Sequence, residues 1–357
     1  MEARNFPNGT KVKVIGLGGG GCNAVTRMAR EHIHGVELIA MNTDAQQLEL
    51  SEAAIRIQLG KRVTRGLGTG GDHTLGQLAA EESRDEIKRV ISGADMLFIT
   101  TGMGGGTGTG AIPLVAELGK QGGALTIGVV TKPFSFEGTH RAKVAEEGIL
   151  KLTDKLDTLV IIPNDRLLQL CDDKTNVESA FEMADQVLHH GVKAISELVT
   201  VPGLINLDLA DVRTVMKDAG PAWMSIGTAS GTNRAKDAAK EALSSPLLDV
   251  SIKGAKRVLF NIAGSDLTLL EVNDAAQIIH QALGPEVNVV FGVIIDPNMG
   301  NEVRLTIIAT GFVSKRVPGN ADWEQKMGKL LEGKSEEELD FPAFLRDRGQ
   351  GSRRTNC

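Results

Sequence analysis

The chain has 357 residues, of which 41% are apolar and 24% charged, so it is long enough for one large domain or two ordinary ones. Aromatic residues make up only 3% and the formal net charge is -6, which argues against a nucleic-acid partner bound through base stacking and phosphate neutralisation. Three cysteines without metal or disulfide spacing, no signal-peptide pattern and no apolar run long enough for a bilayer predict a soluble, cytosolic protein without direct membrane insertion.

From residue 12 to about residue 200, short β-rich segments alternate with segments that have apolar residues at helical spacing. This alternation is typical of βαβ units and predicts an α/β fold around a mostly parallel sheet. Ligands of such sheets bind at the carboxyl ends of the strands, where the glycine-rich segments of this chain fall. The expected strands are 11–16, 36–42, 54–60, 95–101, 124–131 and 157–163, and the expected helices are 23–33, 75–91, 111–120 and 140–152.

The first glycine-rich segment, GLGGGGCN at residues 16–23, directly follows the first expected strand. Its Gly16, Gly18 and Gly21 satisfy the GxGxxG pattern that places a pyrophosphate on a helix N-terminus, and Asp44 stands just past the second strand. These features favour an NAD-dependent oxidoreductase as one alternative. By itself, the segment does not distinguish a dinucleotide from a nucleoside phosphate.

The second glycine-rich segment, GMGGGTGTG at residues 102–110, lies between another buried strand and a helix. Two converging loops can enclose a di- or triphosphate, whereas a dinucleotide enzyme needs only one. The GxxxxGK[ST] pattern is absent, so backbone amides, helix N-termini and bound Mg²⁺ would have to neutralise the phosphates. Thr107 and Thr109 are expected to add hydroxyl donors.

The rest of the chain predicts a long helix followed by a second domain. Residues 177–200 are interpreted as one buried central helix, because apolar residues lie nearly all round it. Residues 221–313 contain four expected strands, with helices at about 233–243 and 272–283. The short PNMGN turn (297–301) between the last two strands predicts that part of this second sheet is antiparallel.

Several motifs then point to a known family. They are GGGTGTG (104–110), FEGTHR (136–141), PNDRLL (163–168), FEMAD (181–185) and PGLINLDLADV (202–212). In this order they resemble the FtsZ family of bacterial tubulin-like cell-division GTPases, from about Val12 to Phe312. The resemblance implies a Rossmann-like GTPase domain with a parallel sheet, a long central helix and a C-terminal α+β domain with a mixed sheet. It also implies a head-to-tail homopolymer that forms the cytokinetic ring at mid-cell, beneath the inner membrane.

The tail carries a further motif, LDFPAFLRDR at Leu339–Arg348. It resembles the C-terminal peptide by which the family meets membrane tethers such as FtsA and division regulators. The expected parts of the chain are a disordered N-terminus (1–11), a GTP-binding domain (12–176), the central helix (177–200), a catalytic loop with its helix (201–220), the C-terminal domain (221–313), a flexible linker (314–338) and the partner-binding peptide and tail (339–357).

The resemblance also assigns a nucleotide site. Glu137 and Arg141 would hold the ribose and a neighbouring phosphate, and Asn164, Phe181 and Asp185 would define the base pocket. Independent chemistry supports Asp185, because guanine presents two adjacent hydrogen-bond donors suited to one carboxylate and adenine does not. The other residues expected to bind the nucleotide are Gly19, Gly20, Gly21, Cys22, Asn23, Asp44, Gly70, Gly71, Gly106, Thr107, Gly108, Thr131 and Pro133.

The segment NLDLAD contains the expected catalytic residues Asn206, Asp208 and Asp211. A helix of this length spans about 36 Å at 1.5 Å per residue, so these side chains would lie far from the phosphates of their own subunit. In the resembling family, they act on the nucleotide of the next subunit. A simpler alternative is that Asp208 or Asp211 only caps the following helix.

The segment GLGTGGDHTLG, 66–76, departs from the family pattern, because Asp72 and His73 replace the commoner Asn-Pro. A carboxylate near a triphosphate is repulsive unless a cation offsets it, so altered hydrolysis or nucleotide exchange is expected. A protein that binds GTP and assembles, but hydrolyses it poorly, therefore stays open as a third alternative.

Overall fold

The computed structural model describes most of the chain up to Phe312. The described residues are 9–31, 33, 35–171, 175–200, 205, 207–245, 252–284 and 286–312. The predicted linker and tail peptide (314–357) and most of the expected disordered N-terminus lie outside them. Among the described helices, none combines the length and the apolar character needed to cross a membrane.

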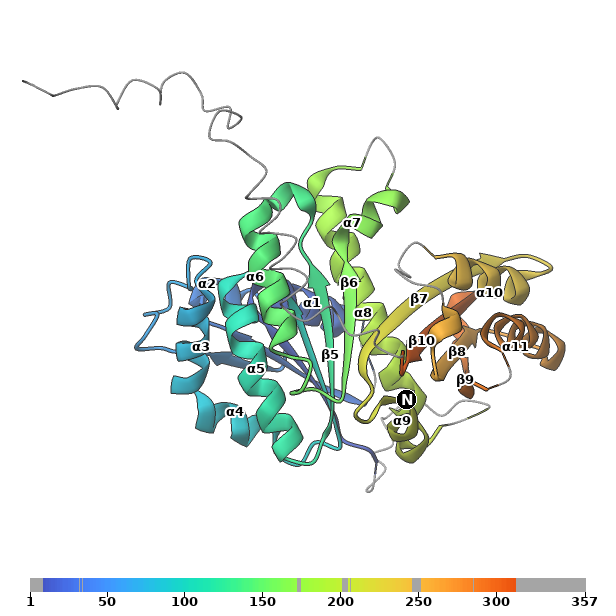
Figure 1. The fold of residues 1–357 in the computed structure, drawn as a ribbon, viewed down its shortest axis with the longest axis horizontal. Coiled ribbons are helices and arrows are strands. Elements are labelled where there is room, and N and C mark those ends of the chain that lie inside the picture. Colours follow the sequence, from blue (N-terminus) through green and yellow to red (C-terminus); the bar gives the residue numbers. More distant parts are fainter. Residues whose placement is uncertain are drawn as a thin grey trace, which may run out of the picture. The chain divides into compact units, whose positions relative to one another are not determined.

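Ten strands form one continuous sheet (Figure 1). They are β1 (Val12–Leu17), β2 (Val36–Asn42), β3 (Ile55–Gln58), β4 (Met96–Gly102), β5 (Leu125–Lys132), β6 (Thr158–Pro163), β7 (Gly220–Ser230), β8 (Arg257–Gly264), β9 (Asn288–Ile295) and β10 (Glu302–Thr310). Their order is β3-β2-β1-β4-β5-β6-β7-β10-β8-β9. Strands β1 to β6 run parallel, as predicted, and β7 extends this part by pairing in parallel with the start of β6.

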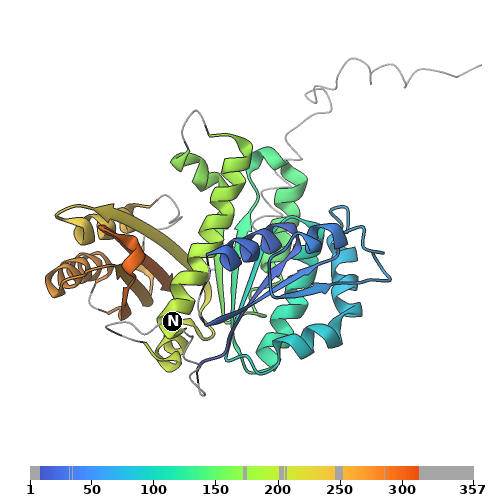
Figure 2. The same cartoon turned by 180° about the vertical axis from the view of Figure 1, so that it is seen from behind.

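Helices cover both faces of the parallel part of the sheet. They are α1 (Gly18–Arg30), α2 (Ala45–Glu49), α3 (His73–Glu82), α4 (Arg84–Ile91), α5 (Gly106–Gln121), α6 (Thr139–Leu150), α7 (Asn164–Leu167), α8 (Val177–Thr200) and α9 (Leu209–Met216). Helices α3 to α6 cover one face, and α1 and α8 cover the other, which Figure 2 shows from behind. Because both faces are covered, alternate residues of each strand enter two separate apolar cores.

The long central helix is confirmed as α8, with the predicted bounds. Its second half is mostly buried, with Val192 and Ile195 fully enclosed, while its first turns are more exposed. Leu198, near its end, packs against Gly292 of β9. Helix α8 therefore joins the parallel part of the sheet to the part formed by the last strands.

The last strands form a mixed sheet, as predicted, but not with the expected neighbours. Strand β10 pairs antiparallel with β7 and with β8, while β9 pairs in parallel with β8 at the edge. The PNMGN turn, which contains a short 3-10 helix (Pro297–Met299), thus joins strands that are not neighbours. Helices α10 (Arg234–Ser244) and α11 (Leu269–Leu283) pack together beside this sheet.

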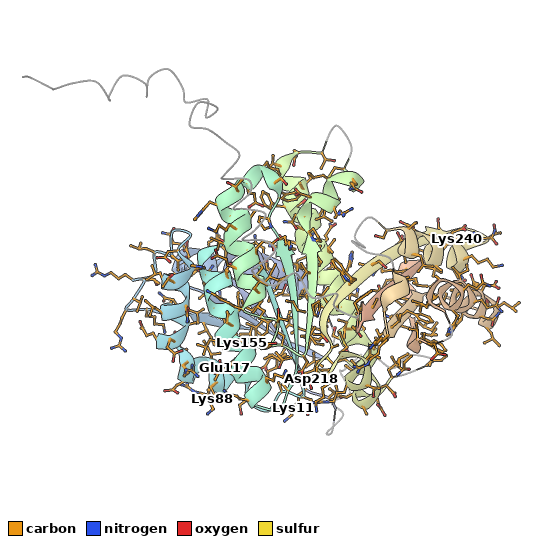
Figure 3. All side chains as sticks on the ribbon, in the orientation of Figure 1. Lys11, Lys88, Glu117, Lys155, Asp218 and Lys240 are labelled. Carbon is orange, nitrogen blue, oxygen red and sulfur yellow. The ribbon has the colours of Figure 1, made fainter. Side chains whose placement is uncertain are left out.

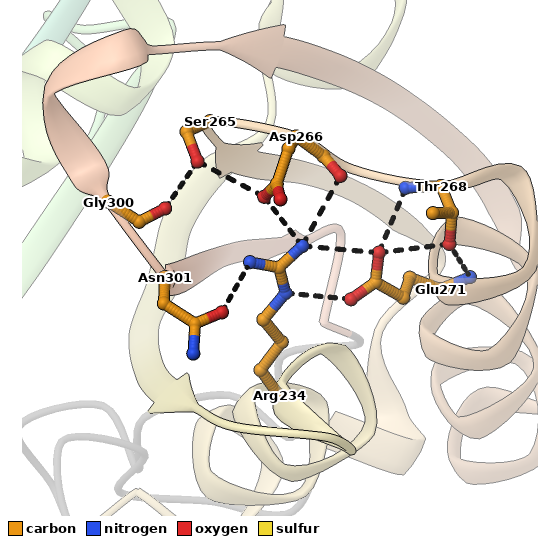
Figure 4. Close-up of polar contacts among 7 residues, drawn as sticks. All are labelled: Arg234, Ser265, Asp266, Thr268, Glu271, Gly300 and Asn301. Carbon is orange, nitrogen blue, oxygen red and sulfur yellow. Dashed lines mark hydrogen bonds and ion pairs between the residues drawn. The ribbon is translucent and has the colours of Figure 1, made fainter.

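A closed network of charges ties these C-terminal elements together around Arg234 (Figure 4). Its guanidinium lies 2.7 Å from both Glu271 Oε1 and Asp266 Oδ1, and donates to Asn301 Oδ1 at 2.9 Å. Glu271 also accepts from the backbone and hydroxyl of Thr268, which caps α11. The hydrogen bond from Arg234 lowers the pKa of Glu271 to about 2.

Charged side chains at the amino edge of the parallel sheet are also paired with one another (Figure 3). Lys155 Nζ lies 2.9 Å from Glu117 Oε2, and Lys120 Nζ lies 3.0 Å from Asp218 Oδ1. These pairs connect the end of α5 to the segments that precede β6 and β7. We interpret them as structural contacts at the edge opposite the glycine-rich turns.

Candidate functional site

Two glycine-rich turns meet at the carboxyl edge of the sheet. Because β1 and β4 are parallel neighbours, the turns after them lie side by side, and they lead into α1 at Gly18 and α5 at Gly106. Gly18 has a φ of 67°, and a Cβ there would lie 3.1 Å from the backbone nitrogen of Gly108. Gly19 is exposed and has open space where a side chain would be. Two adjacent helix N-termini with accessible amides form a site suited to phosphate groups.

The neighbours of Gly19 in the first turn have different surroundings. Gly20 is also exposed, whereas Gly21 is buried and closely approached by the backbone of Thr100. The Cys22 thiol points into the core, 3.7 Å from Met41 O, and burial raises its pKa to about 12. Cys22 can therefore meet a ligand through its backbone, but its side chain is not a reactive thiol.

In the second turn, the glycines are needed for close packing. A Cβ at Gly106 would collide with Thr69, and one at Gly108 would collide with Thr101. The expected hydroxyl donors are engaged inside the protein: Thr109 Oγ1 accepts from the backbone of Gly104 at 2.9 Å, and Thr107 Oγ1 lies 2.6 Å from another buried hydroxyl. Both hydroxyls therefore help to hold the turn in shape, and their donation to a nucleotide stays a prediction.

A cavity of about 630 Å³, which we call the loop cavity, opens beside the second turn. Its wall contains Asp72, whose carboxylate caps α3 by accepting from the backbone of Thr74 at 2.7 Å and Leu75 at 3.2 Å. These hydrogen bonds lower the pKa of Asp72, so it stays ionised beside the cavity. The lining residues are Gly70, Gly71, Asp72, His73, Gly104, Gly105, Gly106, His140, Arg141 and Val144.

Glu137 and Arg141 form the expected pair next to this cavity. Arg141 Nη1 lies 3.0 Å from Glu137 Oε2, and Glu137 Oε1 accepts from the backbone of Phe134 at 2.8 Å. Glu137 is nearly buried, whereas half of the Arg141 side chain is exposed. The arginine is thus oriented by the protein while its outer face is open to a ligand.

A second cavity, of about 740 Å³, lies between α1 and α8, and we call it the helix cavity. It brings together the predicted residues Asn23, Phe181 and Asp185, from two helices that are far apart in the sequence. Burial raises the pKa of Asp185 to about 7, although the nearby Arg27 opposes this shift. Burial thus disfavours the ionised form of Asp185. We expect a ligand that donates hydrogen bonds to this carboxylate and stabilises its charge.

Aromatic rings form one side of this region. Phe181 meets the edge of Phe134 with ring centroids 5.5 Å apart, and Phe136 stacks on Phe134 at 5.0 Å. Phe136 and Phe181 are 58% and 40% exposed, so each has a free face. Exposed aromatic faces next to an acceptor carboxylate suit a planar heterocycle with hydrogen-bond donors.

The remaining expected nucleotide residues divide into two groups. Asn164 is buried and lines neither cavity, and its side-chain oxygen has no hydrogen-bond partner among the described residues. Thr131 and Pro133 lie at the end of β5 and line neither cavity. Asp44 also lines neither cavity and instead caps α2, accepting from the backbone of Gln46 at 3.0 Å.

The predicted catalytic segment lies elsewhere. Asp208 and Asp211 are exposed and cap α9 reciprocally, with Asp211 N donating to Asp208 Oδ1 at 2.8 Å. From α9, Arg213 reaches the backbone of Asp95 and Gly123, just before β4 and β5 begin. The two acids therefore lie toward the amino edge of the sheet, opposite the glycine-rich turns (Figure 1). Asn206 lies outside the described residues.

Some residues of the two cavities were missed by the sequence reasoning. Arg27 and Glu182 face each other across the helix cavity at 3.9 Å, and Phe134 supports the aromatic cluster. His140 lines the loop cavity. The available signal was helical spacing: Arg27 follows Asn23 by four residues and Glu182 precedes Asp185 by three, so each pair shares a helix face.

Comparisons with known proteins agree with this architecture. Residues 11–172 match the GTPase domain model of the Tubulin/FtsZ family, and residues 220–313 match the FtsZ family C-terminal domain. An empty FtsZ dimer from M. jannaschii is 46% identical, with a TM-score of 0.84 over 87% of this chain and 90% of that chain. A GDP-bound CetZ1 monomer from Haloferax volcanii shares the fold at 23% identity, with a TM-score of 0.73 over 90% of this chain and 100% of that chain.

Proposed function

Because the chain belongs to the tubulin/FtsZ family of GTPases, we propose that it binds GTP, assembles head to tail and hydrolyses GTP where two subunits meet. Its filaments would form the cytokinetic ring, in the cytoplasm beneath the inner membrane at mid-cell. Family membership favours this function over an NAD-dependent oxidoreductase. The engagement of Asp44 in capping α2 also leaves that alternative without its ribose-binding carboxylate.

The two cavities suit the two ends of GTP. In the helix cavity, Asp185 would accept from the two donors of guanine, beside the aromatic face of Phe181. At the glycine-rich turns, the N-termini of α1 and α5 would receive the phosphates, and Glu137 and Arg141 would hold the ribose and a neighbouring phosphate. The free side-chain oxygen of Asn164 would gain a partner in the same complex.

The observation that carries the proposal is the separation of binding and acidic residues on opposite edges of one sheet. Asp208 and Asp211 line neither cavity, and α9 packs at the amino ends of the strands. A carboxylate in that position can orient a water against the terminal phosphate only of another subunit. Both acids keep a capping role as well, so the two interpretations of this segment are compatible.

Mg²⁺ is proposed as the partner of the phosphates. Among the described residues, no group of three His, Cys, Asp or Glu side chains is arranged to hold a metal. The ion would therefore be bound mainly by phosphate oxygens and water, which is the usual arrangement for Mg²⁺ with nucleotides. When bound, it would neutralise charge on the phosphates, which the backbone amides alone do only in part.

The self-association would be a heterologous contact that does not close on itself, and such contacts propagate into filaments. The FtsZ of M. jannaschii was solved as a dimer, and a CetZ2 of Haloferax volcanii, 18% identical with a TM-score of 0.70 over 90% of this chain and 100% of that chain, as a protofilament. The segment Leu339–Arg348 would bind membrane tethers such as FtsA and division regulators. Deletion of residues 339–357 should then spare assembly but abolish recruitment to membranes.

The shared site can be tested by mixing two inactive variants. Asp211→Ala should bind GTP without hydrolysing it, and Asp185→Ala should bind GTP poorly while it keeps an intact acidic loop. At equal amounts in a random filament, roughly one quarter of the contacts would pair a bound GTP with an intact loop. Turnover should therefore reappear on mixing.

The control is Asp237→Ala, which removes an exposed acid from the first turn of α10 and should hydrolyse GTP normally by itself. If Asp211→Ala keeps full turnover by itself, the acidic loop is not part of the site. If the mixture stays inactive although both variants enter filaments, the site is not shared. If the unaltered protein binds and assembles with GTP but turns over very slowly, the third alternative holds.

A further inference from the structure

Two histidines enter the loop cavity from helices on either side of α5. His73 is the first residue of α3, and His140 is the second residue of α6. Helices α3 and α6 both pack against α5 (Figure 1). Helix α5 begins at Gly106, which lines the same cavity. His73 is half-buried and His140 is exposed, so both rings are accessible from the cavity. The two histidines therefore lie on either side of the N-terminus of α5, which is proposed to bind the phosphates.

The other charged side chains of this cavity are already engaged. The carboxylate of Asp72 accepts the backbone hydrogen bonds that cap α3, and Arg141 is paired with Glu137. No lysine is among the residues that line the cavity. In contrast, within the described part of the chain, the one hydrogen-bond partner of His73 is Thr74 Oγ1, 3.5 Å from Nδ1, and His140 has no hydrogen bond or ion pair. Together with the exposed half of Arg141, the imidazoles are thus the groups of this cavity that can still donate to a ligand.

We propose that His73 and His140 bind the terminal phosphate of a nucleoside triphosphate and thereby determine the preference for GTP over GDP. This inference rests on the proposed function. The base and the inner phosphates are common to both nucleotides. In the proposed complex, the helix cavity binds the base and the two glycine-rich turns bind the inner phosphates. Only the triphosphate extends an additional charged group into the loop cavity, where imidazole nitrogens can donate to its oxygens.

The charged groups that face the pair are Asp72 beside His73, Lys151 across a small adjoining pocket from His73, and the Arg141–Glu137 pair beside His140. Protonation of Asp185 would weaken both nucleotides alike, because both contain guanine. The ratio of the two affinities therefore isolates the contribution of the histidines.

The test compares GTP and GDP binding to the full chain by competition against a fluorescent guanine nucleotide, at protein concentrations below assembly. The variants are His73→Ala, His140→Ala and both together, which remove the imidazole donors. We expect each single change to reduce the GTP-to-GDP affinity ratio about threefold to fivefold. His280→Ala, at an exposed histidine on α11, is the matched control.

An unchanged GDP affinity in the variants shows that the site is folded, so a reduced ratio then supports the proposal. A ratio that is the same in the double variant and the unaltered protein, with both nucleotides bound, overturns the proposal and leaves GTP binding intact. If the unaltered protein binds neither nucleotide, the proposed function fails, and this inference fails with it.

Discussion

The polar clusters around Arg234 and Asp185 are built in opposite ways. Arg234 is almost fully buried, and its guanidinium is surrounded by Glu271, Asp266 and Asn301 in a network that satisfies its donors (Figure 4). Asp185 is half-buried and faces a cavity, burial raises its pKa, and Arg27 opposes the shift without forming a close pair with it. The first cluster is complete within the protein, and the second is not.

The Arg234 cluster thus has a structural role, whereas we propose a ligand-binding role for Asp185. When every buried polar group of a network is hydrogen-bonded, these bonds offset the free energy lost on desolvation, and they make the helices and strands that carry the groups more rigid. An uncompensated carboxylate costs stability, and it is retained where a ligand provides the compensation. The comparison predicts that disrupting the first cluster lowers stability, whereas neutralising the second lowers binding.

The largest expected effect is on folding. Replacement of Arg234 by Ala leaves Glu271 without its main partner and should lower the free energy of unfolding by about 3 kcal/mol. Urea unfolding followed by circular dichroism measures this change. The control, Lys240→Ala, removes an exposed lysine 3.7 Å from Asp237 and should change stability by about 0.5 kcal/mol or less. Equal effects of the two substitutions would contradict the structural role of Arg234.

The second prediction sharpens the contrast at the other cluster. Asp185→Asn should weaken GDP binding about 100-fold, because the amide presents a donor to the donors of guanine. The nucleotide-free variant should be as stable as the unaltered protein or more so, since a costly buried charge has gone. The amide should also favour xanthosine diphosphate, which has a carbonyl where guanosine has an amine. Competition binding and thermal unfolding check these points, and a destabilised variant with unchanged GDP affinity would reverse the assignment.

A third prediction concerns acid stability, and it depends on the central helix that connects the two regions. His189 is fully buried on α8, and burial lowers its pKa to about 3. The unfolded chain takes up this proton near pH 6.5, so the stability contributed by the neutral ring is present above that pH and is lost as the pH falls. At pH 5 the loss should be about 2 kcal/mol.

His189→Gln should flatten this decline, and urea unfolding at pH 7.5 and pH 5 measures it. The exposed His280 provides the control, because its replacement should leave the slope unchanged. A decline that is equally steep without His189 would mean that other groups cause the acid sensitivity.

The smallest effect is the pH dependence of nucleotide binding. With a pKa of about 7, Asp185 changes from mostly ionised at pH 8 to mostly protonated at pH 6. Because guanine requires the ionised form, GDP affinity should fall up to about tenfold over this interval. Arg27→Gln should move the transition to higher pH, since Arg27 lowers the pKa of Asp185. A GDP affinity that does not vary between pH 6 and pH 8 would show that Asp185 is ionised throughout or does not contact the base.

The sequence predicted the parallel strands and the bounds of α8 because these depend on local periodicity. It placed β10 beside the wrong neighbour, since a short turn such as Pro297–Met299 indicates a reversal but not the pairing that follows. The sequence does not indicate the contact of Thr109 Oγ1 with the backbone of Gly104 or the full burial of His189, because both depend on packing between helices and strands. Asp185, the proposed guanine carboxylate, was predicted from its motif, whereas the opposing Arg27 became evident only when α1 and α8 were placed side by side.

The central claim is that GTP is hydrolysed only where two subunits meet. The most direct test is the rate of GTP turnover per protein molecule over a range of protein concentrations, with Mg²⁺ present. The separation of the acidic loop from both cavities predicts a rate near zero at low concentration that rises above a threshold. A rate per molecule that is the same at every concentration would contradict the claim, because it would mean that one subunit contains the whole active site.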